Sequence, residues 1–273
     1  MPAMRQNSLP RARYWALLLL MILVGFALRL FQLGEQSLWY DETVSAFLAG
    51  LPPDELVGHT ARDIHPPGYY LLLHYWARLA GPSEFALAYF SLIFGVLLIP
   101  LTALLAQHLT RRSVAVWAAL LVCVSPFHVW YAQEVRMYTL AAALGILAAY
   151  CLLRGLYPPH YWRLLGYIII AAAGLYILYF FAFLLIALNL YFAILRVIRR
   201  QSLKPLLLAS GAVMILYLPW LPVAWRQATN PPVPPWRSMP APDTVALESW
   251  TALALGQSVR PEIVWPVLGL TLI

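Results

Sequence analysis

The chain consists mainly of long apolar runs separated by short polar connections. A hydrocarbon layer roughly 30 Å thick is crossed by about 20 helical residues, and several runs reach or approach that length. Backbone polar groups in lipid must be satisfied within the spanning structure, so the pattern predicts a bundle of membrane helices. The predicted spans are residues 14–33, 84–108, 113–131, 136–153, 164–179, 181–197 and 205–223.

Two regions depart from simple spans. Residues 68–81 are apolar, but the run is short and contains His74 and Arg78, which favours an amphipathic or re-entrant helix at the outer membrane interface. We therefore expect residues 34–83 to form an outer first loop with an interfacial helix. Residues 164–197 exceed one average span, which favours a tight helical hairpin near Tyr179 and Phe180.

The C-terminal part begins with a segment rich in Pro and Trp. Residues 224–262 include the run NPPVPPW at 230–236, a composition that disfavours helix and predicts an extended outer loop. A new apolar run has barely begun where the sequence stops at Ile273. We expect residues 1–273 to be the N-terminal part of a single, longer membrane domain, whose first helix is not cleaved as a signal peptide.

Composition and charge agree with a membrane protein. Hydrophobic residues make up 62% of the chain and charged residues 11%, which excludes a water-soluble fold and predicts an all-α polytopic membrane protein. The net charge of +7 arises from Lys and Arg in the short connections, so it indicates positive-inside topology, and no nucleic-acid partner is expected. Cys123 and Cys151 lie within apolar runs and are expected to be buried thiols.

The same topology places all eleven carboxylates in outer segments or at outer helix ends, so we look for function there. Arg29 lies one turn inside the outer end of the first helix and is expected to snorkel to the interface.

The first candidate motif is Trp39-Tyr40-Asp41-Glu42, directly after the first span. A carboxylate there can take a proton from an acceptor hydroxyl or amine while its neighbour helps to orient it. Asp41 and Glu42 are therefore candidate catalytic residues. The alternative is a solvated loop in which both carboxylates face water.

The second motif is DIHPPGYY at 63–70, in which two prolines stiffen the entry to the interfacial helix. His65 can contact a phosphate or position the acidic pair, and Tyr69 is a further candidate binding residue. The alternative is that the prolines only start a helix and that His65 is structural.

The third motif is YAQEVRMY at 131–138, at an outer turn between two spans. Charged residues near hydrocarbon are functional candidates, and the guanidinium of Arg136 suits a phosphate. Glu134, Arg136 and Tyr138 are candidate substrate-binding residues. The alternative is a structural ion pair between Glu134 and Arg136 that closes the turn.

The three motifs in this order resemble polytopic glycosyltransferases of the GT-C fold, in glycosyltransferase family 39, specifically the branch of protein O-mannosyltransferases and lipid A aminoarabinose transferases. The resemblance covers roughly residues 15–200. It implies a GT-C-type helix bundle in which Asp41 is the catalytic base, Glu42 stands beside it, and His65 and Glu134 lie near the lipid phosphate and in the cavity.

The implied reaction is inverting transfer of a monosaccharide from a polyprenyl-phosphate carrier in the lipid bilayer to a protein, lipid or glycan acceptor. We expect it at the outer face of the plasma membrane. A divalent metal stays open as a cofactor, although the acidic residues lack a recognisable ligand spacing. The alternative function is a lipid-linked-sugar transporter or a non-catalytic membrane scaffold.

Overall fold

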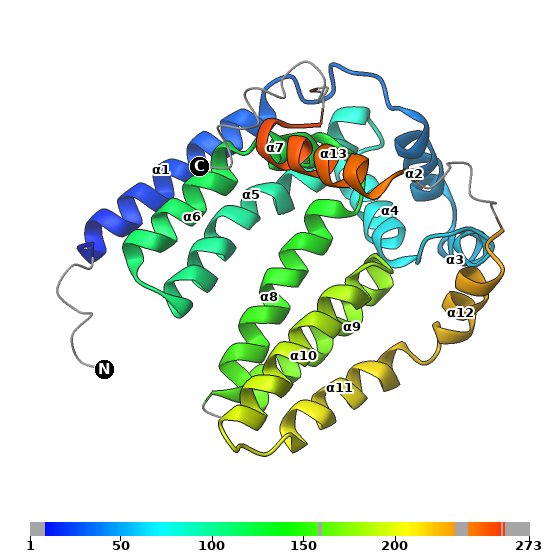
Figure 1. Ribbon diagram of the computed structural model, residues 1–273. Coiled ribbons are helices and arrows are strands. Elements are labelled where there is room, and N and C mark those ends of the chain that lie inside the picture. The colour runs from blue at the N-terminus through cyan, green and yellow to red at the C-terminus, as the bar shows by residue number, and fades with distance from the viewer. Residues whose placement is uncertain (1–8, 158–159, 233–239, 258, 260–273) are drawn as a thin grey trace. The chain divides into compact units, whose positions relative to one another are not determined.

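The computed structural model describes residues 9–157, 160–232, 240–257 and 259, and every regular element within these ranges is a helix (Figure 1). In chain order the helices are α1 (Arg11–Leu30), α2 (Tyr40–Gly50), α3 (Pro53–Ala61), α4 (Gly68–Ala80), α5 (Glu84–Leu109), α6 (Arg112–Val124), α7 (Pro126–Gln133), α8 (Tyr138–Leu156), α9 (Tyr161–Ile177), α10 (Phe181–Ile198), α11 (Lys204–Tyr217), α12 (Leu221–Thr229) and α13 (Pro242–Leu255).

The predicted polytopic membrane bundle is confirmed. Helices α1, α5, α8 and α10 are each long and apolar enough to span a membrane. Two further spans are possible as bent pairs, α6 with α7 at 54° and α11 with α12 at 81°. Helix α9 is apolar but has only 17 residues. The predicted runs at 113–131 and 205–223 therefore correspond to broken helices. A proline stands at each break, since Pro126 is the first residue of α7 and Pro222 is the second residue of α12.

The chain forms two compact units, described separately here. The first contains α1, most of α5, α6, α7 and α13. Its core combines Tyr14, Leu18 and Met21 of α1 with small residues of α5 and α6, namely Ala103, Ala115, Ala119 and Cys123. Small side chains let helix backbones approach closely, which is how helices associate in lipid.

The expectation that Arg29 snorkels to the interface is wrong, because its side chain is fully buried in the first unit. One guanidinium nitrogen donates to the carbonyls of Gly25 (3.0 Å) and Cys123 (3.1 Å), and the other donates to Val122 (2.9 Å). Pro126 has no N–H to offer the carbonyl four residues before it, which is that of Val122. Arg29 thus supplies hydrogen bonds that the break between α6 and α7 removes.

The second unit contains α2, α3, α4, the first turn of α5, and α8 to α12. Helix α9 packs against α8, α10, α11 and α4. A polar group inside this bundle links three helices: Asn189 of α10 donates to the Tyr167 hydroxyl of α9 (2.8 Å) and accepts from the Ser210 hydroxyl of α11 (2.6 Å). Each of these polar atoms therefore has a partner, as apolar surroundings require.

The predicted hairpin between α9 and α10 is present, with its turn at residues 178–180. A Cβ at Gly174 would lie 2.2 Å from the Phe181 ring, so the glycine makes the tight turn possible. The first loop holds α4 at residues 68–80, as predicted, and also the two short helices α2 and α3.

The prediction that residues 224–262 are an extended loop is wrong for residues 224–229 and 242–255, which are helical. Residues 224–229 continue α12, and residues 242–255 form α13, while residues 233–239 of the proline run lie outside the described residues. For α13 the reason is that no proline follows Pro242 until Pro261. Proline suits the first position of a helix, and the sequence that follows contains Ala, Leu and Glu, which favour helix.

Candidate functional site

The N-terminus of α2 places Asp41 and Glu42 of the first motif. The carboxylate of Glu42 is buried, and both of its oxygens accept backbone hydrogen bonds, from the N–H of Trp39 (3.2 Å) and of Val135 (2.7 Å). The first bond caps the start of α2, and the second fixes the segment before α8. Burial raises the pKa of Glu42, although the two N–H groups oppose the shift.

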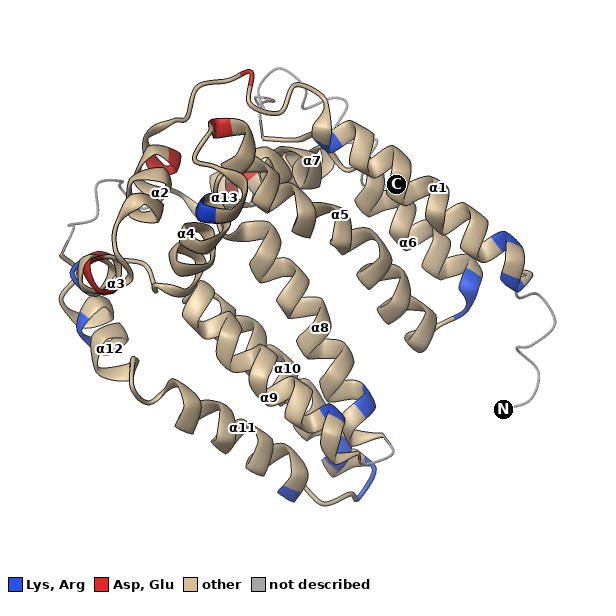
Figure 2. Ribbon diagram, turned by 180° about the vertical axis from the view of Figure 1, so that it is seen from behind, with Lys and Arg blue, Asp and Glu red and all other residues tan. Residues whose placement is uncertain are grey.

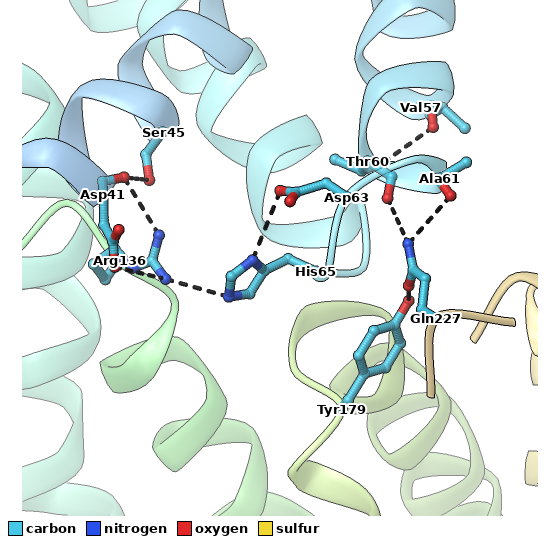
Figure 3. Close-up of polar contacts among 10 residues, drawn as sticks. All are labelled: Asp41, Ser45, Val57, Thr60, Ala61, Asp63, His65, Arg136, Tyr179 and Gln227. Carbon is cyan, nitrogen blue, oxygen red and sulfur yellow. Dashed lines mark hydrogen bonds and ion pairs between the residues drawn. The ribbon is translucent and has the colours of Figure 1, made fainter. Parts of the chain in front are cut away.

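The carboxylate of Asp41 faces Arg136 of the third motif (Figure 3). An Arg136 guanidinium nitrogen lies 3.7 Å from the Asp41 carboxylate, and the other donates to the Asp41 carbonyl at 3.3 Å. The Arg136 side chain is only 4% exposed, whereas that of Asp41 is 38% exposed. A buried cation thus stands beside an accessible carboxylate. The Arg136 guanidinium also lies 5.8 Å from the ring centre of Tyr138, a cation–π distance.

His65 of the second motif joins this pair. Its Nε2 lies 3.3 Å from an Arg136 nitrogen, and its Nδ1 lies 3.9 Å from the Asp63 carboxylate (Figure 3). Arginine can only donate, so Nε2 must accept and the ring proton must reside on Nδ1, facing Asp63. The imidazole of His65 beside this carboxylate is the main reason why the pKa of Asp63 is lowered. We name the resulting chain of Asp63, His65, Arg136 and Asp41 the acid–arginine cluster.

The local sequence explains how His65 is held. Proline restricts the residue before it to extended backbone, and Pro66 and Pro67 stand between His65 and the first residue of α4. The end of α3, just before the cluster, is fixed by a residue of α12. Gln227 donates to the carbonyls of Thr60 (2.8 Å) and Ala61 (3.3 Å) and accepts from the Tyr179 hydroxyl (Figure 3).

The structure brings together Asp41, His65, Arg136 and Tyr138 of the predicted site residues, with Glu42 behind them. Tyr69 is fully buried on α4, with its ring against that of Tyr70. Glu134 belongs to the first compact unit, where its carboxylate accepts from the Trp130 indole at 2.7 Å. That Glu134 contributes to the substrate cavity stays a prediction.

Sequence reasoning missed three residues that the structure places in or behind the cluster: Asp63, Tyr70 and Gln227. Asp63 and Tyr70 lie inside the second motif, so their position in the sequence near His65 and Tyr69 could have identified them as candidate site residues. Gln227 is separated from Thr60 by 167 residues, and nothing in the local pattern singles it out.

A separate cavity of about 440 Å³ lies between α2 and α3. It is lined by Phe47 of α2, by Leu51 directly after that helix, and by residues of α3 that include Asp54 and Glu55. Both carboxylates occupy the first turn of α3, where the helix dipole favours them without any ligand. Among the described residues, no three His, Cys, Asp or Glu side chains converge to hold a metal ion.

Comparison with known proteins supplies the family. The sequence profile of the dolichyl-phosphate-mannose-protein mannosyltransferase family matches residues 64–225, more than half of the chain. The match includes His65, Arg136 and the helices α4 to α11, whereas Asp41 and Glu42 precede it. No curated protein sequence matches the chain. The family implies a membrane glycosyltransferase that uses a polyprenyl-phosphate sugar, and the chain belongs to the dolichyl-phosphate-mannose-protein mannosyltransferase family.

Proposed function

We propose that this protein is an inverting glycosyltransferase that moves a monosaccharide from a polyprenyl phosphate to a hydroxyl or amine outside the cytoplasm. The observation that carries the proposal is the pairing of the accessible carboxylate of Asp41 with the buried guanidinium of Arg136, 3.7 Å apart. A glycosyl transfer from a phosphate needs a base for the acceptor and a cation for the leaving group, and this pair supplies both.

In the proposed reaction Asp41 is the general base. It accepts the proton of the acceptor O–H or N–H while the acceptor atom bonds to the anomeric carbon of the sugar. The bond from that carbon to the phosphate oxygen breaks, and its electron pair leaves with the polyprenyl phosphate. Attack opposite the leaving group inverts the anomeric centre, and the proton on Asp41 then passes to water.

Arg136 stabilises the charge that develops on the departing phosphate. A guanidinium is always charged and presents several donors in one plane, which suits phosphate oxygens. His65 and Asp63 act as positioning residues in this scheme. Asp63 fixes the ring proton on Nδ1, so that Nε2 stays free to accept from Arg136 and to hold the guanidinium in place.

Glu42 has a positioning role rather than a catalytic one in our proposal. Both of its oxygens accept backbone N–H groups, so neither is available to take a proton from an acceptor without a bond being lost. These bonds tie the start of α2 to Val135, the residue directly before Arg136. Glu42 therefore supports the pairing of Asp41 with Arg136.

The charge distribution of the second unit supports an extracytoplasmic site. Basic residues gather at one end of its helices, including Arg154 at the end of α8 and Arg163 near the start of α9 (Figure 2). Arg136 lies two residues before the start of α8, at the other end of the helix from Arg154. Helix α8 has 19 residues and is thus about 28 Å long. Because Lys and Arg favour the cytoplasmic side, the acid–arginine cluster should face away from the cytoplasm.

The test is transfer of labelled mannose from a polyprenyl phosphate by membranes that contain the full protein, with Asp41→Asn as the key variant. We expect this variant to lose transfer by about 100- to 10,000-fold, the usual contribution of a general base. Asp54→Asn is the matched control, because Asp54 also lies in the first turn of a short helix but outside the cluster, and it should keep wild-type activity.

The alternatives give different results. Full activity of Asp41→Asn would refute the assigned base. If the wild-type protein moved the lipid-linked sugar between leaflets without forming a glycosylated product, it would be a transporter. If it formed no product and moved no carrier with any polyprenyl-phosphate sugar, a scaffold role would be favoured.

A further inference from the structure

A buried tyrosine hydroxyl next to the acid–arginine cluster has no hydrogen-bond partner among the residues that the structure describes. Tyr70 is the third residue of α4, and its side chain is 0% exposed. Its ring meets that of His65 edge to face, with the ring centres 6.4 Å apart. Among the described residues, no donor or acceptor lies within hydrogen-bond reach of its hydroxyl oxygen.

Leaving a buried hydroxyl unpaired is unfavourable, since it costs about 1–3 kcal/mol relative to a satisfied or absent group. Nearly all buried polar groups in native proteins have a partner, so an exception needs an explanation. Phenylalanine would fill the same space without the penalty. The hydroxyl at Tyr70 is therefore best explained by a partner that binds from outside the chain.

The surroundings of Tyr70 indicate the chemistry of that partner. The groups that act electrostatically on its phenol are Arg136, Asp63, Asp41 and Tyr138, so the hydroxyl belongs to the same charged region as the cluster. Burial raises the pKa of Tyr70 to about 12, which keeps the phenol protonated at neutral pH. A protonated phenol beside a buried arginine presents donors to a ligand that only accepts hydrogen bonds.

We propose that the Tyr70 hydroxyl donates a hydrogen bond to a phosphate oxygen of the lipid-linked substrate, next to the guanidinium of Arg136. This inference rests on the proposed function, which supplies the phosphate monoester or diester. It assigns Tyr70 a direct contact with the substrate. The bond would form on donor binding and would persist to the leaving polyprenyl phosphate, whose oxygens carry more charge.

The variant Tyr70→Phe tests the assignment, because it removes one oxygen and keeps the ring. We expect kcat/KM for the polyprenyl-phosphate sugar to fall about 10- to 100-fold, equivalent to about 1.4–2.7 kcal/mol. In the absence of substrate the thermal midpoint should stay the same or rise, since no internal hydrogen bond is lost. Tyr75→Phe is the matched control on the same helix, where the side chain is 60% exposed, and it should change neither quantity.

A binding measurement separates this inference from the proposed function. Polyprenyl phosphate without sugar should raise the thermal midpoint of the purified wild-type protein, and it should raise that of Tyr70→Phe less. Inorganic phosphate at the same concentration should protect neither protein, which would identify a lipid-linked phosphate as the ligand.

Each outcome has a distinct meaning. A wild-type protein that transfers sugar while Tyr70→Phe is equally active would refute the role of Tyr70 and leave the proposed function intact. A lowered thermal midpoint of the ligand-free variant would also refute it, because the hydroxyl would then have an internal partner. If the wild-type protein transferred no sugar, the proposed function would fail, and loss of protection by polyprenyl phosphate in Tyr70→Phe would still support the phosphate contact.

Discussion

Gly68 is the position where a single methyl group should disturb the candidate site most directly. It is the first residue of α4, three residues after His65. A Cβ at this position would lie 2.6 Å from the carbonyl oxygen of Tyr176 in α9, and 3.0 Å from the carbonyl carbon. Both are backbone atoms, which cannot turn aside as a side chain can. Gly68→Ala therefore forces α4 and α9 apart.

The size of the effect follows from two opposing terms. Alanine normally stabilises a helix by roughly 0.5–1 kcal/mol relative to glycine, and less at the first position. Overpacking in a close contact costs about 1–3 kcal/mol. We expect the free energy of unfolding to fall by about 1–2 kcal/mol in Gly68→Ala. Transfer activity should fall too, because a shift of α4 moves His65, whose contact with Arg136 is already long at 3.3 Å.

The assay is thermal or denaturant unfolding of the purified protein in detergent, together with sugar transfer by membranes. Gly211→Ala in the interior of α11 is the matched control, because a Cβ there meets nothing within 4 Å. This control should be as stable as the wild type or more stable, by up to about 1 kcal/mol. The reasoning would be refuted if Gly68→Ala were as stable as Gly211→Ala.

Two further predictions concern polar groups of the second unit. The pKa of Asp63 is lowered, chiefly by the neighbouring imidazole of His65. The charged form of Asp63 therefore stabilises the fold above its ordinary pKa of 3.8, and this contribution is lost as the pH falls through the lowered value. The difference in unfolding free energy between wild type and Asp63→Asn should thus be constant above about pH 5 and shrink in more acidic solution; a difference that grows on acidification would contradict the assignment. Asn189→Leu removes both hydrogen bonds to Tyr167 and Ser210 and should lower the unfolding free energy by about 0.5–2 kcal/mol in detergent, with unchanged stability as the contrary result.

The membrane helices were predictable because the length and hydropathy of an apolar run are enough to indicate a membrane-spanning helix. The predicted start of the helix at residue 84 and the hairpin near Tyr179 agree with the structure. The bends at 54° and 81° were not predicted, because hydropathy stays high across Pro126 and Pro222 while the backbone hydrogen bonding changes there. Helix α13 was missed because residues 224–262 were judged as one segment, and the prolines before α13 dominated its composition.

The candidate site was predictable only as a set of motifs. Asp41 was chosen as a carboxylate that can take a proton, His65 as an imidazole that can contact a phosphate, and Arg136 as a charged residue near hydrocarbon. The structure brings the three together. The sequence did not indicate which of these side chains are free to contact a substrate and which are held by the protein itself. Whether Glu42 is free or bonded depends on Val135, which is 93 residues away, and whether the Tyr70 hydroxyl has a partner depends on the packing of the whole second unit.

The hydrogen bonds of Arg29 set an order of events during synthesis. The carbonyls that receive its side chain belong to residues 93 and 94 positions later in the chain. At a synthesis rate of about 5–20 residues per second, the first helix waits roughly 5–20 s before those carbonyls exist. Arg29 is the next-to-last residue of α1, and a guanidinium so near a helix end can reach the headgroups in that interval. We therefore expect the charge that is buried in the finished protein to reside first at the membrane surface, and to leave it when α6 docks onto α1.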